Sequence, residues 1–200
     1  MTVKAVFFDI GNVLLKFDAA KIVRKIAWEL RANPLKIALF MRKTRLVDPI
    51  ERGEISPEAL YAMFQEKLGF KGDQKAFRLL WCDHFTVQRA TANLLKAVAK
   101  TRKVYLLSNT NLLHYEFIRE RYAFAGQVHG AVLSYELKLR KPEPEIYLAA
   151  LKMAGVEPQE AVFIDDLKEN VEGARKVGIT ALHYTGSAAL KKELKDLGVL

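Results

Sequence analysis

Apolar runs rich in β-branched and aromatic residues recur along the chain, and segments with helical periodicity separate most of them. The runs occupy residues 3–8, 104–107, 128–133, 161–164 and 180–184. The helical segments between them include residues 91–100, 112–122, 143–153 and 169–177. Strands that alternate with helices in this way predict an α/β fold, in which helices cover both faces of a parallel sheet.

A long stretch between the first two runs indicates an insertion. Residues 9–103 far exceed the length of one crossover helix, and we find no convincing strand among them. Within this stretch, residues 18–85 show helical patterns only, at residues 19–30, 34–44, 56–68 and 73–83. We therefore expect a Rossmann-like core formed by residues 1–17 and 86–200, with an all-helical cap, residues 18–85, inserted after the first strand.

The composition narrows the class of partner. Of the 200 residues, 50% are hydrophobic, which is ample for a core, and the net charge is +9. That charge suits an anionic ligand such as a phosphate ester or a nucleic acid. The basic residues are spread over helical patterns and form no dense tract with interleaved aromatic residues, so we expect no nucleic-acid partner.

Apolar segments and cysteine usage indicate the compartment. Charged residues interrupt every apolar run well before the roughly 20 residues that span a bilayer, so we expect no membrane partner. The first run stops at Asp9 and lacks the features of a secretory signal, and the single Cys82 cannot form an internal disulfide. We expect a cytoplasmic protein, and its oligomeric state stays open.

The first apolar run ends at a carboxylate. Residues 6–14 read Val-Phe-Phe-Asp-Ile-Gly-Asn-Val-Leu, which places Asp9 at a strand tip, just before a turn at Gly11 and Asn12. Ligands of parallel sheets collect outside the carboxyl ends of the strands, so Asp9 is a candidate nucleophile. Taken alone, an aspartate that opens a turn is the simpler interpretation.

Two later loops carry groups that can hold an anion. Ser108 and Asn109 follow the second run and lead into a helix, where a hydroxyl and helix N-terminal amides come together. Lys141 stands directly before Pro142, which can occupy the first turn of the next helix, so the lysine would lie beside a positive helix end. Each feature, taken alone, is also typical of an ordinary helix cap or a surface lysine.

A pair of adjacent carboxylates follows the apolar run at residues 161–164. Asp165 and Asp166 stand at its end, with Asn170 one helical turn further on. Two acids at one strand tip are costly unless a cation or a basic group neutralises them. Mg²⁺ prefers oxygen ligands and takes one or two protein carboxylates, so the pair predicts a magnesium site. Helix capping would explain one of the two acids more readily than both.

Four successive loops thus carry an acid, Ser-Asn, Lys-Pro and Asp-Asp, and in this order the chain resembles the haloacid dehalogenase-like hydrolase superfamily. The matching motifs are FFDIGNVLL, LLSNT, RKPEPEIY and FIDDLKENVEGARKVGI, and the resemblance covers essentially the whole chain. The first motif is similar to that of a bacterial subgroup that starts Asp-x-Gly-Asn-Val and includes a sugar-1-phosphate phosphatase. Residues 134–138 resemble the approach to the third motif, although a glycine is usual where Lys138 stands.

The resemblance implies aspartate-based phosphoryl transfer, with Mg²⁺ as cofactor and a small phosphorylated metabolite as substrate. By the family's pattern, Asp9 would be the nucleophile and would form an aspartyl-phosphate. Ser108 and Asn109 would bind the phosphoryl group. Lys141 would bind it as well and would neutralise charge on Asp9. Phosphoryl transfer depends mainly on such positioning and charge matching.

The resemblance also implies a set of metal ligands. Asp9, the backbone carbonyl of Gly11 and Asp166 would bind Mg²⁺. Asp165 would either share the metal shell or orient Lys141. These residues are the oxygen donors that the ion prefers.

Gly11 departs from the usual pattern of the family's phosphatases. An aspartate usually stands there, where it protonates the leaving alcohol and later activates water, and neither Gly11 nor the amide of Asn12 can do so. Losing this general acid costs about a hundred- to ten-thousandfold in rate. We therefore expect a substrate with an easy leaving group, such as an anomeric sugar phosphate, or one that supplies its own proton relay. Asn170 also stands where an acid is often found.

Two alternatives to the phosphatase stay open. A metal-free 2-haloacid dehalogenase also lacks the second aspartate, although the acid pair would then be hard to explain. A catalytically weak phosphate-binding or interaction protein would keep the anion site without turnover.

Substrate choice is expected to lie in the cap. The polar or aromatic residues to watch there are Trp28, Met41, Arg42, Arg45, Trp81 and His84. Packing inside the cap is the favoured interpretation of both tryptophans, and the two arginines are expected at the surface. The lone histidine is assigned no role.

Overall fold

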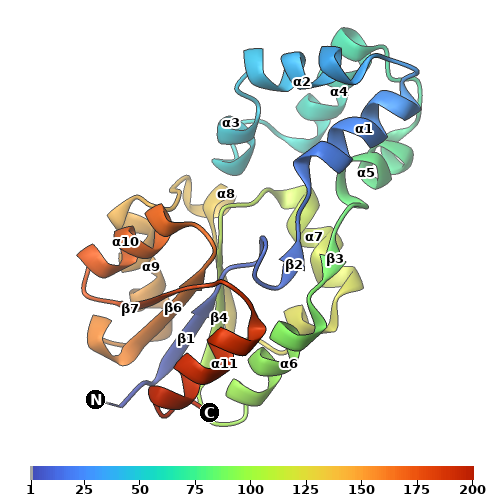
Figure 1. Ribbon diagram of the computed structural model, residues 1–200. Helices are drawn as coiled ribbons and strands as arrows, with labels where there is room; N and C mark the ends of the chain where they lie inside the picture. Colours follow the sequence, from blue (N-terminus) through green and yellow to red (C-terminus); the bar gives the residue numbers. More distant parts are fainter. Residues whose placement is uncertain (1) are drawn as a thin grey trace.

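A computed structural model describes residues 2–200 and has a parallel sheet at its centre (Figure 1). The five strands lie in the order β5-β4-β1-β6-β7. They are β1 (Ala5–Phe8), β4 (Lys103–Ser108), β5 (Gly130–Leu133), β6 (Ala161–Asp165) and β7 (Thr180–His183). Each strand falls within or beside one of the predicted apolar runs.

Helices cover both faces of this sheet. Successive strand residues point to opposite faces, so each face contributes side chains to a core of its own. Phe7, Tyr105 and Phe163 belong to one core cluster, which includes side chains of α9 (Pro144–Ala154) and α10 (Lys168–Lys176). Phe8 and Leu106 belong to the other, with α6 (Arg89–Val98), α7 (Leu112–Arg121) and α11 (Ser187–Asp196). Burial on both faces explains why the strands are continuously apolar. The predicted α/β fold is confirmed.

A group of helices within residues 18–85 lies beyond the carboxyl ends of the strands (Figure 1). We call it the helical insertion. Its helices are α1 (Ala19–Glu29), α2 (Pro34–Lys43), α3 (Val47–Glu51), α4 (Pro57–Leu68) and α5 (Gln74–Cys82). Polar side chains accept hydrogen bonds from backbone N–H groups at the starts of four of them, from Asp18, Asn33, Ser56 and Asp73.

The helical insertion has its own hydrophobic core. Phe64, Phe77 and Trp81 pack edge to face or stacked at its centre. Phe117 from α7 belongs to the same cluster and ties the insertion to the sheet domain. Three further short elements of the described chain are α8 (Ser134–Leu137) and the 3₁₀ turns at Ala123–Gly126 and Pro158–Glu160.

The expectation of no strand between the first two runs is wrong. Two short strands, β2 (Leu15–Lys16) and β3 (Thr86–Val87), pair antiparallel where the chain enters and leaves the helical insertion. The backbone N–H of Gln88 donates to the Leu14 carbonyl at 2.8 Å beside them. Two-residue strands leave no alternation for a sequence pattern to reveal. The pair joins the chain segment that enters the helical insertion to the segment that leaves it. We call this connection, residues 15–17 and 85–87, the neck.

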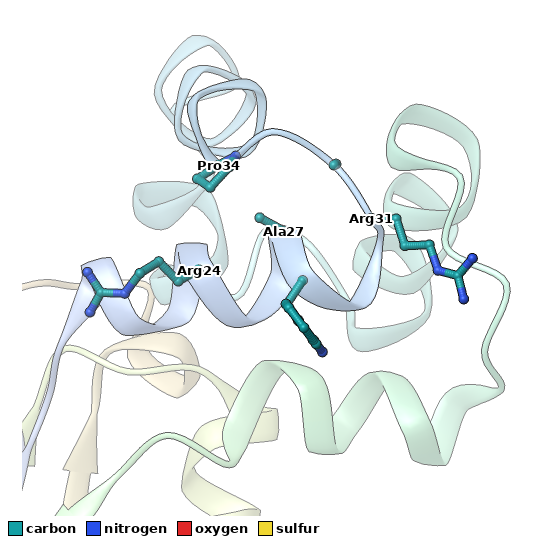
Figure 2. A pocket seen from close by; sticks show the side chains of 6 residues that line it. Arg24, Ala27, Arg31 and Pro34 are labelled. Atoms are coloured by element: carbon teal, nitrogen blue, oxygen red, sulfur yellow. The ribbon is translucent and has the colours of Figure 1, made fainter.

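Trp28 is not packed inside the insertion, contrary to expectation. Its side chain is 86% exposed, whereas Trp81 is 5% exposed and lies in the insertion core as predicted. An open groove is lined by Trp28 with Ala27, Ala32 and Pro34, and by Arg24 and Arg31 (Figure 2). Arg42 and Arg45 are exposed, as expected. In residues 2–200, no helix is both long and apolar enough to cross a membrane.

Candidate active site

The carboxyl ends of three neighbouring strands bring the predicted residues together. Asp9 follows β1, Ser108 ends β4 and Asp165 ends β6, and these strands are adjacent in the sheet. Lys141 reaches the same point from the loop between α8 and α9. A cavity of about 430 Å³ opens above them, and its lining includes the predicted site residues Asp9, Gly11, Ser108, Asn109, Lys141 and Asp166.

Lys141 lies between two carboxylates at the base of this cavity. Its Nζ donates to Asp9 Oδ1 at 2.7 Å, to Asp165 Oδ2 at 2.6 Å and to the Leu107 carbonyl at 2.9 Å. All three charged side chains are buried. Burial raises the pKa of Asp9, and the nearby Lys141 opposes that rise. Burial alone would lower the pKa of Lys141, but Asp9 and Asp165 raise it, so the lysine is held as a cation.

Asp165 has both carboxylate oxygens engaged by donors. Its Oδ1 accepts from the Leu167 N–H at 2.8 Å, and the Asn170 Nδ2 donates to both oxygens at 3.0 Å. With Lys141 on Oδ2, this set of contacts fits a residue that orients the lysine. The aspartates do not cap the following helix, because α10 begins at Lys168 with Leu167 as its N-cap.

Asp9 and Asp166 are better suited to bind a metal ion. Carboxylate oxygens of Asp9, Asp165 and Asp166 lie within 4.8 Å of one another. Asp166 is half-buried, accepts one side-chain hydrogen bond, from Asn12 at 3.1 Å, and burial raises its pKa. Oδ1 of Asn170 is buried and has no hydrogen-bond partner among the described residues. An unpaired amide oxygen beside clustered carboxylates suits a hard cation.

The Gly11 carbonyl already accepts the Val13 N–H at 2.7 Å, and its second lone pair remains for the predicted metal contact. Asn12 adopts the left-handed conformation, with φ 51°, and its Oδ1 accepts from the Phe17 N–H at 3.1 Å. Both ends of this amide are therefore engaged, because its Nδ2 holds Asp166. The turn after β1 is thus fixed by its own hydrogen bonds.

Asn109 positions Lys141 with its side chain. Its Oδ1 accepts from the Lys141 N–H at 2.8 Å and its Nδ2 donates to the Lys141 carbonyl at 2.9 Å. A phosphoryl contact by Asn109 would therefore come from its backbone. Pro142 does not start a helix as expected: α9 begins at Pro144, with Glu143 as its N-cap. Lys138, where a glycine is usual, has φ 58° and shows why that position favours glycine.

Burial favours the neutral form of two histidines near the neck. Burial lowers the pKa of His84 to about 3 and that of His114 to about 4. His114 lines the cavity, and its ring nitrogens contact Asn111 Nδ2 at 3.0 Å and the Trp81 carbonyl at 3.2 Å. Sequence reasoning missed His114, because a histidine within a helix gives no signal of what lies above it.

A family model supplies the decisive comparison. The model of haloacid dehalogenase-like hydrolases matches residues 3–178, which include the first three predicted motifs and all but the last residue of the fourth. The chain belongs to this family of hydrolases. The buried triplet of Asp9, Lys141 and Asp165 lies within the residues that the family model matches.

Several members of the haloacid dehalogenase-like family are similar to this chain over nearly its full length. The sesquiterpene phosphatase astK of Aspergillus oryzae is 28% identical and covers 98% of this chain and 97% of its own. The D-ribitol-5-phosphate phosphatase of Bacteroides thetaiotaomicron is 26% identical, and the alignment covers 96% of this chain and 97% of the relative. A third relative is the HAD family enzyme bt-2542 from that bacterium, whose structure was solved in complex with magnesium and inorganic phosphate. It superposes with a TM-score of 0.78 at 26% identity, and the match covers 90% of this chain and 93% of the other.

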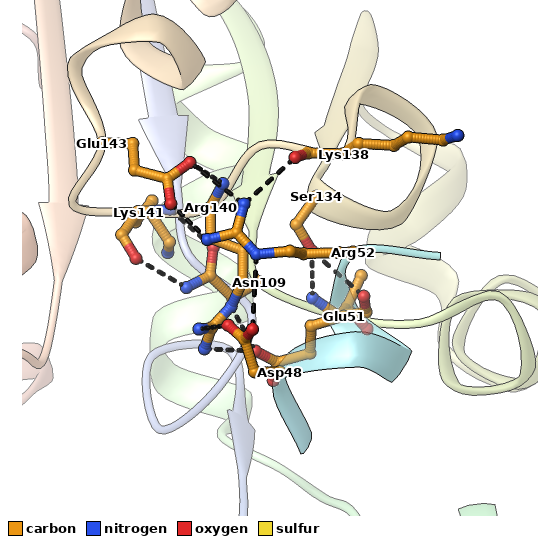
Figure 3. A network of polar contacts seen from close by, with 10 residues as sticks. Asp48, Glu51, Arg52, Asn109, Ser134, Lys138, Arg140, Lys141 and Glu143 are labelled. Atoms are coloured by element: carbon orange, nitrogen blue, oxygen red, sulfur yellow. Dashed lines mark hydrogen bonds and ion pairs between the residues drawn. The ribbon is translucent and has the colours of Figure 1, made fainter. Parts of the chain in front are cut away.

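An ion-pair network links the helical insertion to the loop that carries Lys141 (Figure 3). Arg140 pairs with Asp48 and Glu51 of α3, its Nη2 lying 2.6 Å from Glu51 Oε2. Arg52, just after α3, pairs with Glu143 and donates to the Lys138 carbonyl at 3.1 Å. Sequence reasoning missed α3 and this network, because the pairs join residues far apart in the chain.

Proposed function

We propose that this hydrolase is a magnesium-dependent phosphatase, which acts on a small phosphorylated compound through an aspartyl-phosphate on Asp9. The observation that carries the proposal is the buried Lys141, held between Asp9 and Asp165 at 2.7 Å and 2.6 Å, with Asp166 beside them. One cation among three carboxylates leaves negative charge that a divalent ion would balance. We also propose that residues 18–85 act as the cap over a core of residues 1–17 and 86–200.

The reaction would proceed in two steps at one carboxylate. Lys141 contacts Asp9 Oδ1, which leaves Oδ2 to attack phosphorus while the bond from phosphorus to the leaving oxygen breaks. Water then attacks phosphorus and releases inorganic phosphate and free Asp9. Ser108 would donate a hydrogen bond to a phosphoryl oxygen, and Lys141 would neutralise charge on the transferring group.

Asp9, Asp166 and the Gly11 carbonyl would hold Mg²⁺, with Asn170 Oδ1 nearby. When bound, the ion would offset the charge on the phosphoryl oxygens. Asp165 would orient Lys141, because its two oxygens accept hydrogen bonds from Lys141, Asn170 and Leu167.

Phosphate release is expected to require Mg²⁺, and Asp166→Asn is expected to raise the Mg²⁺ concentration for half-maximal rate by about tenfold or more, since one charged ligand is lost. Phosphate release from phenyl phosphate, titrated with Mg²⁺ after treatment with a chelator, measures this. Glu145→Gln, an exposed acid on α9, is the matched control and should leave the titration unchanged.

Further assays on the same protein distinguish the two alternative functions. Chloride release from 2-chloropropionate in the presence of chelator, without phosphate release, would point to a dehalogenase. Binding of phosphate with no turnover and no fluoride-trapped adduct on Asp9 would point to a non-catalytic protein. Either result would overturn the phosphatase.

Turnover is expected to depend steeply on the acidity of the leaving group, because no acid stands at Gly11. From substituted phenyl phosphates to simple alkyl phosphates, kcat/KM should fall by about a hundredfold or more. Gly11→Asp should flatten that dependence by speeding the alkyl esters. A Cβ at this position would lie 3.7 Å from Asp9 Oδ2, an ordinary contact, so the site admits a side chain.

Gly126→Asp serves as the control for the added charge, because a Cβ at Gly126 would meet nothing within 4 Å. It should leave the dependence on leaving-group acidity unchanged. Equal rates for aryl and alkyl esters in the wild type would contradict the inference that the enzyme lacks a general acid.

A further inference from the structure

The cavity above Asp9 has two chemically different ends. Its base, at the carboxyl ends of the strands, carries the charged and polar groups of the proposed phosphoryl site. Its roof comes from the helical insertion and the neck. The volume of about 430 Å³ is towards the lower end of the roughly 300–1,000 Å³ of ligand pockets. The space beyond the phosphoryl group is therefore limited to a compact substituent.

The helical insertion contributes apolar side chains to this roof. They are Ile22, Val23, Met41, Val47, Ile50 and Trp81. Phe85, the last residue of the insertion, and Phe17, just before it, extend the same surface. The single charged residue that the insertion adds within the described lining is Glu51, and its carboxylate is held by Arg140 at 2.6 Å.

Asn111 and His114 in the wall bond to each other, and Arg140 is paired with Asp48 and Glu51. Asn111 Oδ1 accepts the His114 N–H at 3.0 Å, and the His114 ring contacts Asn111 Nδ2 and the Trp81 carbonyl. Nε1 of Trp81 is buried and has no hydrogen-bond partner among the described residues, so it is a single N–H donor beside an otherwise apolar roof. A substituent rich in hydroxyl groups would lose its hydrogen bonds to water here and gain few in return.

Apolar surface is also left in contact with solvent at this cavity. Phe17, Val47 and Leu167 are 38%, 52% and 48% exposed, and all three line it. They come from the neck, from α3 and from the turn before α10, so they gather at the cavity although they lie far apart in the sequence. Such a gathering of exposed apolar side chains is typical of a surface that an apolar group covers.

We propose that the substrate is a phosphate monoester of a compact apolar alcohol or phenol, whose hydrocarbon part fills the roof formed by the insertion. This inference rests on the proposed phosphatase function and names its substrate class. It differs from the sugar phosphate suggested by the first motif, because the side chains that the insertion adds to the roof are apolar apart from Glu51, which is paired with Arg140. An apolar phenol is also an easy leaving group, which suits a site where Gly11 supplies no general acid.

The sharpest test compares cyclohexyl phosphate with myo-inositol 1-phosphate. Both have a six-membered carbon ring, and the ring of the inositol ester alone carries hydroxyl groups. The inositol oxygen is the better leaving group, so chemistry alone would favour it. We expect kcat/KM for cyclohexyl phosphate to be higher by about tenfold or more, as when a hydroxyl must enter an apolar pocket. An equal or higher value for the inositol ester overturns the proposal.

A double variant tests whether the roof causes the preference. Val23→Thr with Val47→Thr keeps the side-chain shape and adds two hydroxyls, so kcat/KM for cyclohexyl phosphate should fall about fivefold or more. Acetyl phosphate, whose small leaving group does not reach the roof, should be hydrolysed as by the wild type. Leu148→Thr, at a side chain 53% exposed on α9, is the control and should change neither rate. An unchanged preference in the double variant would overturn the assignment to the roof.

Binding separates this inference from the proposed function. Cyclohexylmethylphosphonate cannot be hydrolysed, and calorimetry with Mg²⁺ present should show it binding about tenfold or more tighter than inorganic phosphate. Tight phosphonate binding without turnover of phenyl phosphate would refute the phosphatase and keep the apolar site. Turnover of phenyl phosphate with no advantage for the phosphonate would do the reverse.

Discussion

Asp9→Asn is expected to lower kcat by about 10⁴-fold or more while leaving the protein folded, because the variant removes the oxygen nucleophile and keeps its shape. Lys141 would keep its other partner, Asp165, at 2.6 Å. The buried group would then hold one cation and one anion, where the wild type has two carboxylates to one lysine. The unfolding temperature without Mg²⁺ should therefore stay equal to the wild type's or rise.

Measurement of kcat on phenyl phosphate and thermal unfolding with and without Mg²⁺ checks both parts. Mg²⁺ should stabilise the variant less than the wild type, because a ligand has lost its charge. Trapping with beryllium fluoride should label the wild type alone. Asp196→Asn, at an exposed acid of α11, is the control and should match the wild type. Wild-type turnover by Asp9→Asn would rule out the aspartyl-phosphate.

The sequence indicated which strand-end side chains meet at the base of the cavity, because of a property of parallel sheets. Polar residues that end neighbouring strands must meet at one edge, whatever the loops between them do. Asp9, Ser108 and Asp165 end adjacent strands and do meet there. Lys141 needed the family resemblance, since a lysine before a proline gives no hint that its Nζ lies buried between two carboxylates.

Features that depend on side-chain partners far apart in the chain could not be predicted. The engagement of the Asn109 amide with the Lys141 backbone and the pairs of Arg140 with α3 arise from the folded arrangement alone. The same holds for the apolar roof, whose members look like ordinary core residues in the sequence. Trp28 shows the converse, because an apolar position in a helical pattern proved to face outwards.

Lys141→Met is expected to destabilise the protein by about 3–5 kcal/mol, because it leaves two buried carboxylates without their cation. Asp165 is fully buried and Asp9 nearly so, and the lysine is their shared partner. For a chain of this size, the unfolding temperature should fall by about 6–20 °C. Turnover should be lost as well, since the charge on Asp9 and on the phosphoryl group is no longer offset.

The pH dependence of this loss tests its electrostatic origin. Burial already raises the pKa of Asp9 in the wild type, and removing Lys141 takes away the opposing contact. A carboxyl whose pKa is raised by folding destabilises the folded state at pH values above that pKa, where it must be charged, and no longer does so once protonated. The deficit of Lys141→Met relative to the wild type should therefore shrink as the pH falls from about 8 to about 5.

A double variant separates lost charge from lost packing. Lys141→Met with Asp165→Asn removes one buried anion together with the cation, so it should recover much of the stability that Lys141→Met loses. Lys192→Met, at an exposed lysine of α11, is the control and should unfold like the wild type at every pH. A Lys141→Met protein as stable as the wild type at pH 8 would show that the carboxylates are neutralised without the lysine. The charge arrangement on which the mechanism rests would then be wrong.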